Sequence, residues 1–146
     1  MEKHLDRPGF GLLVLRVVAA SFMLTHGWPK LQKIFAGDWT FADPIGVGQG
    51  PSLLLAALAE FGGSVLVLVG WKARWAAIPV VFTMLVAGIV VHANDPWARK
   101  ELAFLYGTIY AAVVFLGPGR YSVDGWLGGS GETGRDRKST RLNSSH

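Results

Sequence analysis

The chain contains no cysteine among its 146 residues. It therefore forms no disulfide bond, holds no cysteine-ligated iron–sulfur cluster or covalently attached haem, and performs no thiolate catalysis. This absence excludes a redox centre built from the chain's own thiols. A redox role would have to use a bound cofactor or a partner protein.

Charge is also scarce, because 16% of the residues are charged while 51% are hydrophobic. The mean hydropathy is +0.35. These values are typical of a small polytopic membrane protein, and the length fits one domain. The lipid bilayer is therefore the first partner that the sequence predicts.

The last part of the chain, Asp136–His146, has the sequence DRKSTRLNSSH and resembles the translation of a common sequencing adapter. It carries Arg137, Lys138 and Arg141 against one acidic residue, which is half of the net charge of +4. We predict that residues 136–146 are not native and that the native C-terminus is missing near Arg135. The weakly basic remainder then gives no indication of nucleic acid as a partner.

Four apolar runs are long enough to cross a bilayer as helices, and they are apolar nearly all round rather than on one face. They predict an all-α fold, an integral membrane four-helix bundle with a longer loop between helices 1 and 2, in one domain over residues 1–135. Tryptophans at the ends of the runs match the aromatic belt of a membrane interface. The predicted helices span residues 9–28, 51–71, 75–92 and 97–117.

A cleaved signal peptide is the alternative for the first run, but Arg16 lies in its middle and no small-x-small cleavage site follows. A retained membrane helix is favoured. The excess of Lys and Arg on one side predicts that both termini lie in the cytoplasm. Six basic residues fall on that side and four on the other, namely Lys3, Arg7, Lys72, Arg74, Arg120 and Arg135 against Lys30, Lys33, Arg99 and Lys100.

Arg16 and Glu60 are ionisable residues inside the first and second runs, where a charge costs ~2.5–3.5 kcal/mol near the helix centre. In antiparallel helices their depths differ by ~5 Å, so we predict an intramembrane Arg16–Glu60 ion pair with a structural role. A proton or ligand role for the pair, and snorkelling of Arg16 to the interface, are the alternatives. Small residues beside Glu60 predict close helix packing at Ala56, Gly63 and Ser64.

A second polar group is predicted at the opposite side, where His26 ends the first helix and His92 ends the third. Imidazoles bind metals or hydrogen-bond to quinone carbonyls, and nearby cations stabilise anionic ligands. Two histidines without a spacing motif indicate no metal site. We predict a small-ligand pocket with a quinone as the candidate cofactor, formed by His26, Lys30, His92, Glu101, Tyr106 and Tyr110. The alternative is that these are interfacial or packing side chains.

The connection between the first two helices covers residues 27–50 and includes KLQKIF and IGVGQG. A short interfacial helix followed by a glycine-rich hairpin is predicted there. GVGQG lacks the preceding strand and the Lys-Ser/Thr pair of a phosphate-binding loop.

Several motifs, in order from Phe10 to Asp124, resemble the DoxX family: THGWPKL, AEFGG, VGWKARWAA, VVH and LGPGRYSVD. The resemblance implies a small bacterial inner-membrane protein with four transmembrane helices. Family members are associated with respiratory or oxidative-stress functions, some by similarity to a subunit of a thiosulfate:quinone oxidoreductase, others within membrane complexes that protect against oxidants. The matching motifs mark Arg16, His26, Gly27, Lys30, Glu60, Gly63, His92, Arg120 and Asp124 as important positions.

The sequence and this resemblance together predict a quinone- or redox-associated subunit of a respiratory or oxidative-stress complex, with electrons supplied by an external donor or a bound quinone. No residue is assigned as catalytic. One alternative is a non-catalytic membrane scaffold for a soluble oxidoreductase partner. Another is a small-solute or proton-linked transporter, which four helices would support as a homo-oligomer.

Overall fold

Four long helices make up most of residues 5–128, the part of the chain that the computed structural model describes. Two of these helices contain a π-helical segment, in which the backbone hydrogen bonds run from residue i to i+5. No strand occurs within the described range, so the predicted all-α fold is confirmed. In chain order the elements are α1 (Arg7–Phe35), α2 (Gln49–Ala57), η1 (Leu58–Gly63), α3 (Ser64–Val69), α4 (Ala73–Val86), η2 (Ala87–Val91) and α5 (Trp97–Leu116).

Three of these helices, Arg7–Phe35, Gln49–Val69 and Ala73–Val91, are long and apolar enough to cross a membrane by length and composition. The fourth, α5, has 20 residues but carries three charged residues in its first turns, Arg99, Lys100 and Glu101. It is thus long enough to cross with the others, and it is the most polar of the four at one end.

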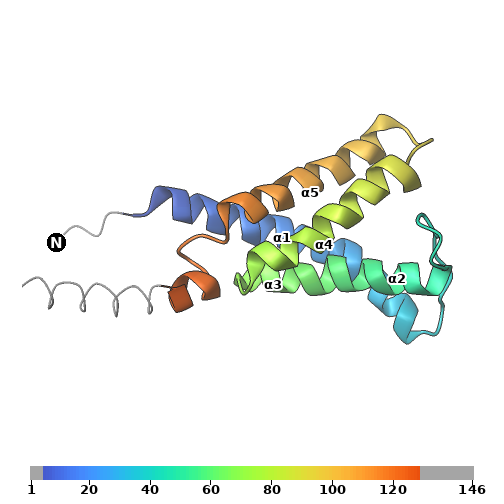
Figure 1. Cartoon of the computed structure of the whole chain (residues 1–146), viewed down its shortest axis with the longest axis horizontal. Coiled ribbons are helices and arrows are strands. Elements are labelled where there is room, and N and C mark those ends of the chain that lie inside the picture. The colour runs from blue at the N-terminus through green and yellow to red at the C-terminus, as the bar shows by residue number, and fades with distance from the viewer. Residues whose placement is uncertain (1–4, 129–146) are drawn as a thin grey trace, which may run out of the picture.

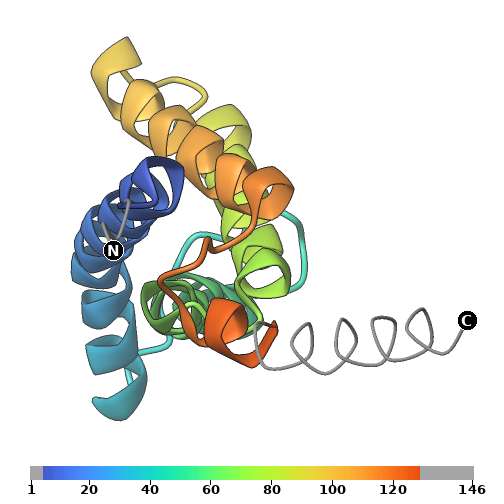
Figure 2. The ribbon, with the colours of Figure 1, turned by 90° about the vertical axis from the view of Figure 1, so that its left-hand side faces the viewer.

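The helices form two antiparallel pairs, α1 with α2–η1–α3 and α4–η2 with α5 (Figure 1). The pairs meet closely at the end of the bundle where α1 begins and α5 ends, and they diverge toward the opposite end (Figures 1 and 2). Small side chains make the close meeting possible. The core there consists largely of alanine and valine, including Ala19, Ala20, Val67, Ala73, Ala76, Ala77, Val80 and Val113.

Two glycines allow backbone-to-backbone approach along the second helix. A Cβ added at Gly27 would lie 2.8 Å from the Phe61 nitrogen, and one added at Gly63 would lie 2.9 Å from the Ala76 carbonyl oxygen. Gly27 thus brings α1 against η1, and Gly63 brings α4 against the other side of the same segment. Ser64 is fully buried beside Gly63, and its hydroxyl hydrogen-bonds to the Tyr110 hydroxyl at 2.7 Å.

Helix α1 continues past its predicted end at residue 28, through Pro29, to Phe35. The separate interfacial helix predicted over KLQKIF is therefore wrong. Proline removes only one backbone donor, the one for the carbonyl four residues before it, so the rest of the helical ladder persists. Lys30 therefore projects from the same continuous helix as Arg16 and His26, and not from a separate short helix.

The segments at Arg7 and after Leu116 lie at the same end of the bundle (Figure 1). This agrees with an even number of crossings, while the cytoplasmic location of the termini stays a prediction. The proposal that residues 136–146 are not native lies outside the described residues.

Candidate functional site

Arg16 and Glu60 do not form the predicted ion pair. The Arg16 guanidinium bonds to backbone carbonyls, and Glu60 instead accepts a hydrogen bond from Lys30, with Nζ and Oε2 2.6 Å apart. The reason lies in helix geometry, because each Cα–Cβ bond tilts toward the N-terminus of its own helix. In two antiparallel helices this sends the Arg16 and Glu60 side chains toward opposite ends of the bundle.

Arg16 holds together three segments at the narrow end of the bundle, and only 1% of its surface is exposed. It donates to the carbonyls of Val67 and Leu68 at 2.9 and 3.0 Å, and to those of Pro118 and Tyr121 at 2.6 and 3.0 Å. The first two belong to the last turn of α3, whose carbonyls have no partner within the helix. A cation there also complements the negative end of the helix dipole.

Asp124, next to Arg16, accepts hydrogen bonds from the start of α4, as Arg16 donates them to the end of α3. Its carboxylate oxygens accept hydrogen bonds from the Lys72 and Ala73 nitrogens at 2.8 and 3.0 Å, at the start of α4. An anion at a helix N-terminus is favoured by the same dipole. Arg16 and Asp124 thus close the turn between α3 and α4 from both sides, whereas Arg120 is exposed nearby. This end of the molecule is a structural junction.

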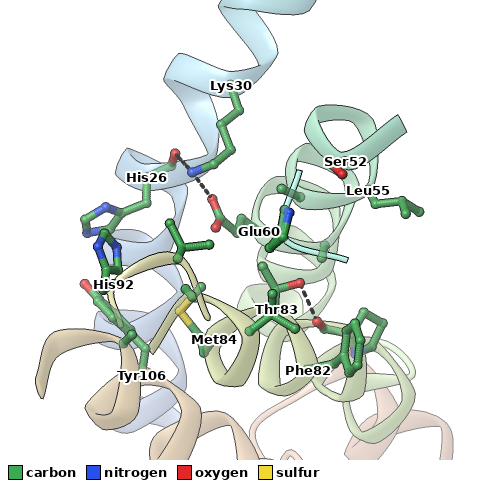
Figure 3. A pocket seen from close by; sticks show the side chains of 18 of the residues that line it. His26, Lys30, Ser52, Leu55, Glu60, Phe82, Thr83, Met84, His92 and Tyr106 are labelled. Carbon is green, nitrogen blue, oxygen red and sulfur yellow. Dashed lines mark hydrogen bonds and ion pairs between the residues drawn. The ribbon is translucent and has the colours of Figure 1, made fainter. Parts of the chain in front are cut away.

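A pocket of about 470 Å³ lies at the wide end, between the two helix pairs (Figure 3). Four of the six predicted pocket residues line it: His26, Lys30, His92 and Tyr106. The other two do not, because Glu101 lies on the exposed face of α5 and Tyr110 is buried about one turn deeper against Ser64. Glu60, predicted as part of a structural pair, also lines this pocket.

The polar groups of the pocket are tied to each other. The Lys30 ammonium donates to Glu60 and to the His26 carbonyl, at 2.6 and 3.2 Å. The Glu60 side chain is 6% exposed and that of Lys30 is 22% exposed. The ring of His26 stands edge-on to Tyr106, with centroids 5.6 Å apart. Figure 3 shows His26, His92 and Tyr106 gathered at one side of the pocket.

His92 is oriented from outside the pocket by Asp95, whose Oδ2 lies 2.6 Å from Nδ1 of the ring. The hydrogen bond to His92 and the charge of Arg99 hold the pKa of Asp95 below its usual value of 3.8. Asp95 is therefore a carboxylate at neutral pH and keeps Nδ1 occupied. That leaves Nε2 of His92 as the nitrogen that can meet a ligand.

Both π-helical segments border the pocket. Glu60 lies in η1, and His92 follows η2 directly. Such segments interrupt the regular hydrogen-bond ladder and are frequent at functional sites. Within residues 5–128, no three His, Asp or Glu side chains gather into a group that could hold a metal ion.

Most of the pocket surface is apolar and was not predicted from the sequence. Met23 and Met84 form part of its wall, with Leu55 and Phe82 on the side away from the histidines (Figure 3). Methionines and leucines in an apolar run give no signal that distinguishes a pocket wall from a packed core. Asp95 had a local signal, because it lies three residues after His92 at a helix end.

The model of the DoxX family matches residues 11–93, more than half of the chain. The chain belongs to the DoxX family. The matched range includes His26, Lys30, Glu60 and His92, so four polar residues of the pocket lie within the part that carries the family pattern.

Two curated relatives extend the likeness of this DoxX-family chain beyond the matched range. The inner membrane protein YqjF of Escherichia coli (strain K12) is 32% identical over 118 residues, which cover 78% of this chain and 89% of that protein. An uncharacterized protein of Haemophilus influenzae (strain Rd) is 31% identical over 135 residues, covering 85% and 93%. No solved structure matches the chain significantly. With its apolar helices, this DoxX-family chain is a bacterial inner membrane protein.

Proposed function

We propose that this DoxX-family protein binds a quinone in the pocket between its helix pairs, as the quinone-associated subunit of a respiratory or oxidative-stress complex. One observation carries the proposal, namely a largely apolar pocket between apolar helices, with His26, His92 and Tyr106 gathered at one side. Its volume of about 470 Å³ is within the range of small-molecule sites. A quinone ring has the matching shape, apolar faces with hydrogen-bond acceptors at its edge.

Lys30 is the main candidate to meet a quinone carbonyl. Its ammonium has three N–H donors, and Glu60 and the His26 carbonyl accept two hydrogen bonds from it. One donor remains for a ligand, and it is aimed by the other two contacts. A positive charge at this place also favours negative charge on the ligand when electrons arrive.

His92 and Tyr106 supply two further polar groups at the same side of the pocket. The Tyr106 hydroxyl can donate to a second acceptor, and Nε2 of His92 can exchange a proton with a ligand oxygen while Asp95 fixes the ring. The chain's own residues thus bind, orient and exchange protons. Electrons would come from a partner oxidoreductase, because the chain has no thiols to carry them.

Co-purification tests this proposal directly. We expect the protein, extracted in mild detergent, to carry a quinone detectable by mass spectrometry and absorbance. His26→Ala/His92→Ala should reduce the bound quinone at least ~10-fold, which corresponds to a loss of ~1.4 kcal/mol. Tyr106→Phe should also reduce it, while Tyr110→Phe serves as the matched control because that hydroxyl bonds to Ser64 outside the pocket.

Added quinone should also raise the melting temperature of ligand-free protein, since a ligand at 100 times its Kd stabilises the fold by ~2.7 kcal/mol. No quinone in the purified protein together with no shift at saturation would overturn the proposal. A soluble oxidoreductase that still co-purifies with His26→Ala/His92→Ala would then support the scaffold alternative.

Asp95→Ala is expected to weaken quinone binding by about three- to tenfold, through the loss of one charge-assisted hydrogen bond that positions His92. In a His92→Ala background the same change should have no further effect, because the ring that Asp95 positions is already gone. Titration of the four variants with quinone measures this coupling. Asp38→Ala is the control, since Asp38 bonds to Thr40 in the loop and does not line the pocket. Additive losses would show that Asp95 acts independently of His92.

A further inference from the structure

We propose that the ligand of this pocket carries a long apolar tail, which leaves the pocket sideways between α2 and α4 into the hydrocarbon of the bilayer. The inference rests on the proposed function and names its substrate class, a quinone with an isoprenoid or alkyl tail rather than a water-soluble quinone.

The two sides of the pocket differ in the polar groups that are left for a ligand (Figure 3). His26, His92 and Tyr106 lie at the first side. Leu55 and Phe82 lie at the second, together with Ser52 and Thr83, whose hydroxyls already donate hydrogen bonds to other groups of the protein. A ligand that fills the pocket must therefore have a polar head and an apolar remainder that point in opposite directions. A free ring without a tail would satisfy only the first side.

The apolar side of the pocket opens toward lipid because α2 and α4 hardly touch each other. Leu55 projects from α2 and Phe82 from α4, and they are 54% and 58% exposed while also lining the pocket. The walls between them are made by small or compact residues. These are Ala56 and Ala59 on the α2–η1 side, with Pro79, Thr83 and Ala87 on the α4–η2 side.

The position of this opening along the helices determines whether it faces lipid acyl chains or headgroups. Leu55 lies six residues inside the start of α2, or about 9 Å at 1.5 Å per residue, and Phe82 lies about 14 Å from the end of η2. Both depths lie within a hydrocarbon core of about 30 Å. The opening therefore faces lipid acyl chains rather than headgroups.

The end of the pocket nearest the helix termini is lined by apolar groups of the α1–α2 connection and by the exposed Arg99 of α5. Phe41, Pro44 and Ile45, from the connection between α1 and α2, line the pocket there. The same connection is held to α2 by a hydrogen bond from the Ser52 hydroxyl to Asp43, 3.1 Å long. Entry from the bilayer is thus the less obstructed route for an apolar ligand.

Photocrosslinking locates the tail. The probe is a benzoquinone with a decyl tail that ends in a diazirine, added to the full chain in lipid nanodiscs. We expect mass spectrometry to find crosslinks concentrated on Leu55, Phe82 and Val86, and the tailless parent quinone to suppress them by occupying the polar side. Competed crosslinks confined to residues of α1 or of the α1–α2 connection would overturn the lateral exit.

Affinity measurements complete the test. Leu55→Trp should weaken binding of the decyl quinone at least fivefold, after correction for partition into lipid, and leave the tailless quinone unchanged. Leu58→Trp is the matched control, because Leu58 is 59% exposed on the next turn but does not line the pocket. Equal effects on both quinones would overturn the inference and leave the proposed function standing. Failure of both quinones to bind the wild type would instead reject the proposed function and the inference together.

Discussion

Arg16→Met is expected to lower the stability of the protein by at least ~3 kcal/mol. The change leaves four backbone carbonyls without their donor, those of Val67, Leu68, Pro118 and Tyr121. An unsatisfied buried acceptor costs ~1–3 kcal/mol. Thermal unfolding in detergent, followed by the fluorescence of the six tryptophans, measures the loss.

Arg16→Lys separates the role of charge from that of hydrogen-bond geometry. A lysine keeps the cation at the end of α3 but has a compact ammonium instead of a planar fork of five donors, so we expect it to recover only part of the lost stability. Arg120→Met is the control, because Arg120 is exposed at the same end of the bundle. A melting temperature of Arg16→Met equal to that of Arg120→Met would contradict the structural role.

The contrast between Arg16 as predicted and as found shows what sequence reasoning can reach in this fold. Hydropathy established the helices, and the cost of a charge in lipid correctly indicated that Arg16 must be partnered. Glu60 was the predicted partner only because it lies at a similar depth to Arg16 along the antiparallel helix. The partner is decided by the direction of the side chain and by free carbonyls at the end of another helix, and neither is visible in a hydropathy pattern.

Of the six residues grouped as a candidate pocket, the structure brings four together. His26 and His92 were grouped because both end helices at one side, and the structure places them in one pocket with Lys30 and Tyr106. Tyr110 was included because residues four apart share a helix face. That rule gives the face but not the depth, and the helix pairs close between Tyr106 and Tyr110, so that only Tyr106 reaches the pocket.

The charged residues at the two ends of the molecule have different surroundings. At the narrow end the buried Arg16 and the partly buried Asp124 are satisfied by backbone groups and fix the turn between α3 and α4. At the wide end the buried Glu60 carboxylate is paired with the Lys30 side chain, and this ion pair borders an open pocket. Changes at the narrow end should therefore act on stability, whereas changes at the wide end can separate stability from ligand binding.

Variants of Lys30 and Glu60 can separate stability from ligand binding. We expect the two single variants to lose different amounts of stability. Lys30→Met should cost ~3 kcal/mol or more, because it leaves the Glu60 carboxylate, 6% exposed, without its partner. Glu60→Gln should cost ~1–2 kcal/mol, since the amide can still accept a hydrogen bond and the Lys30 side chain is 22% exposed. The double variant should regain most of the loss, because no buried charge is left unpaired.

Across these variants, the affinity for quinone should depend on whether the Lys30 ammonium is present and not on the stability of the fold. The free energy of unfolding of the double variant Lys30→Met/Glu60→Gln is expected to lie within ~1 kcal/mol of the wild-type value. The double variant should nevertheless bind quinone at least ~10-fold more weakly, because the donor to the ligand is gone. Lys33→Met is the matched control, one turn further along α1, where Lys33 pairs with Asp38 at 3.7 Å outside the pocket. Thermal unfolding and quinone titration of the wild type, the two single variants, the double variant and Lys33→Met measure both effects. If the double variant folds well and binds quinone as tightly as the Lys33→Met control, Lys30 has no part in ligand binding, and the pair serves the fold alone.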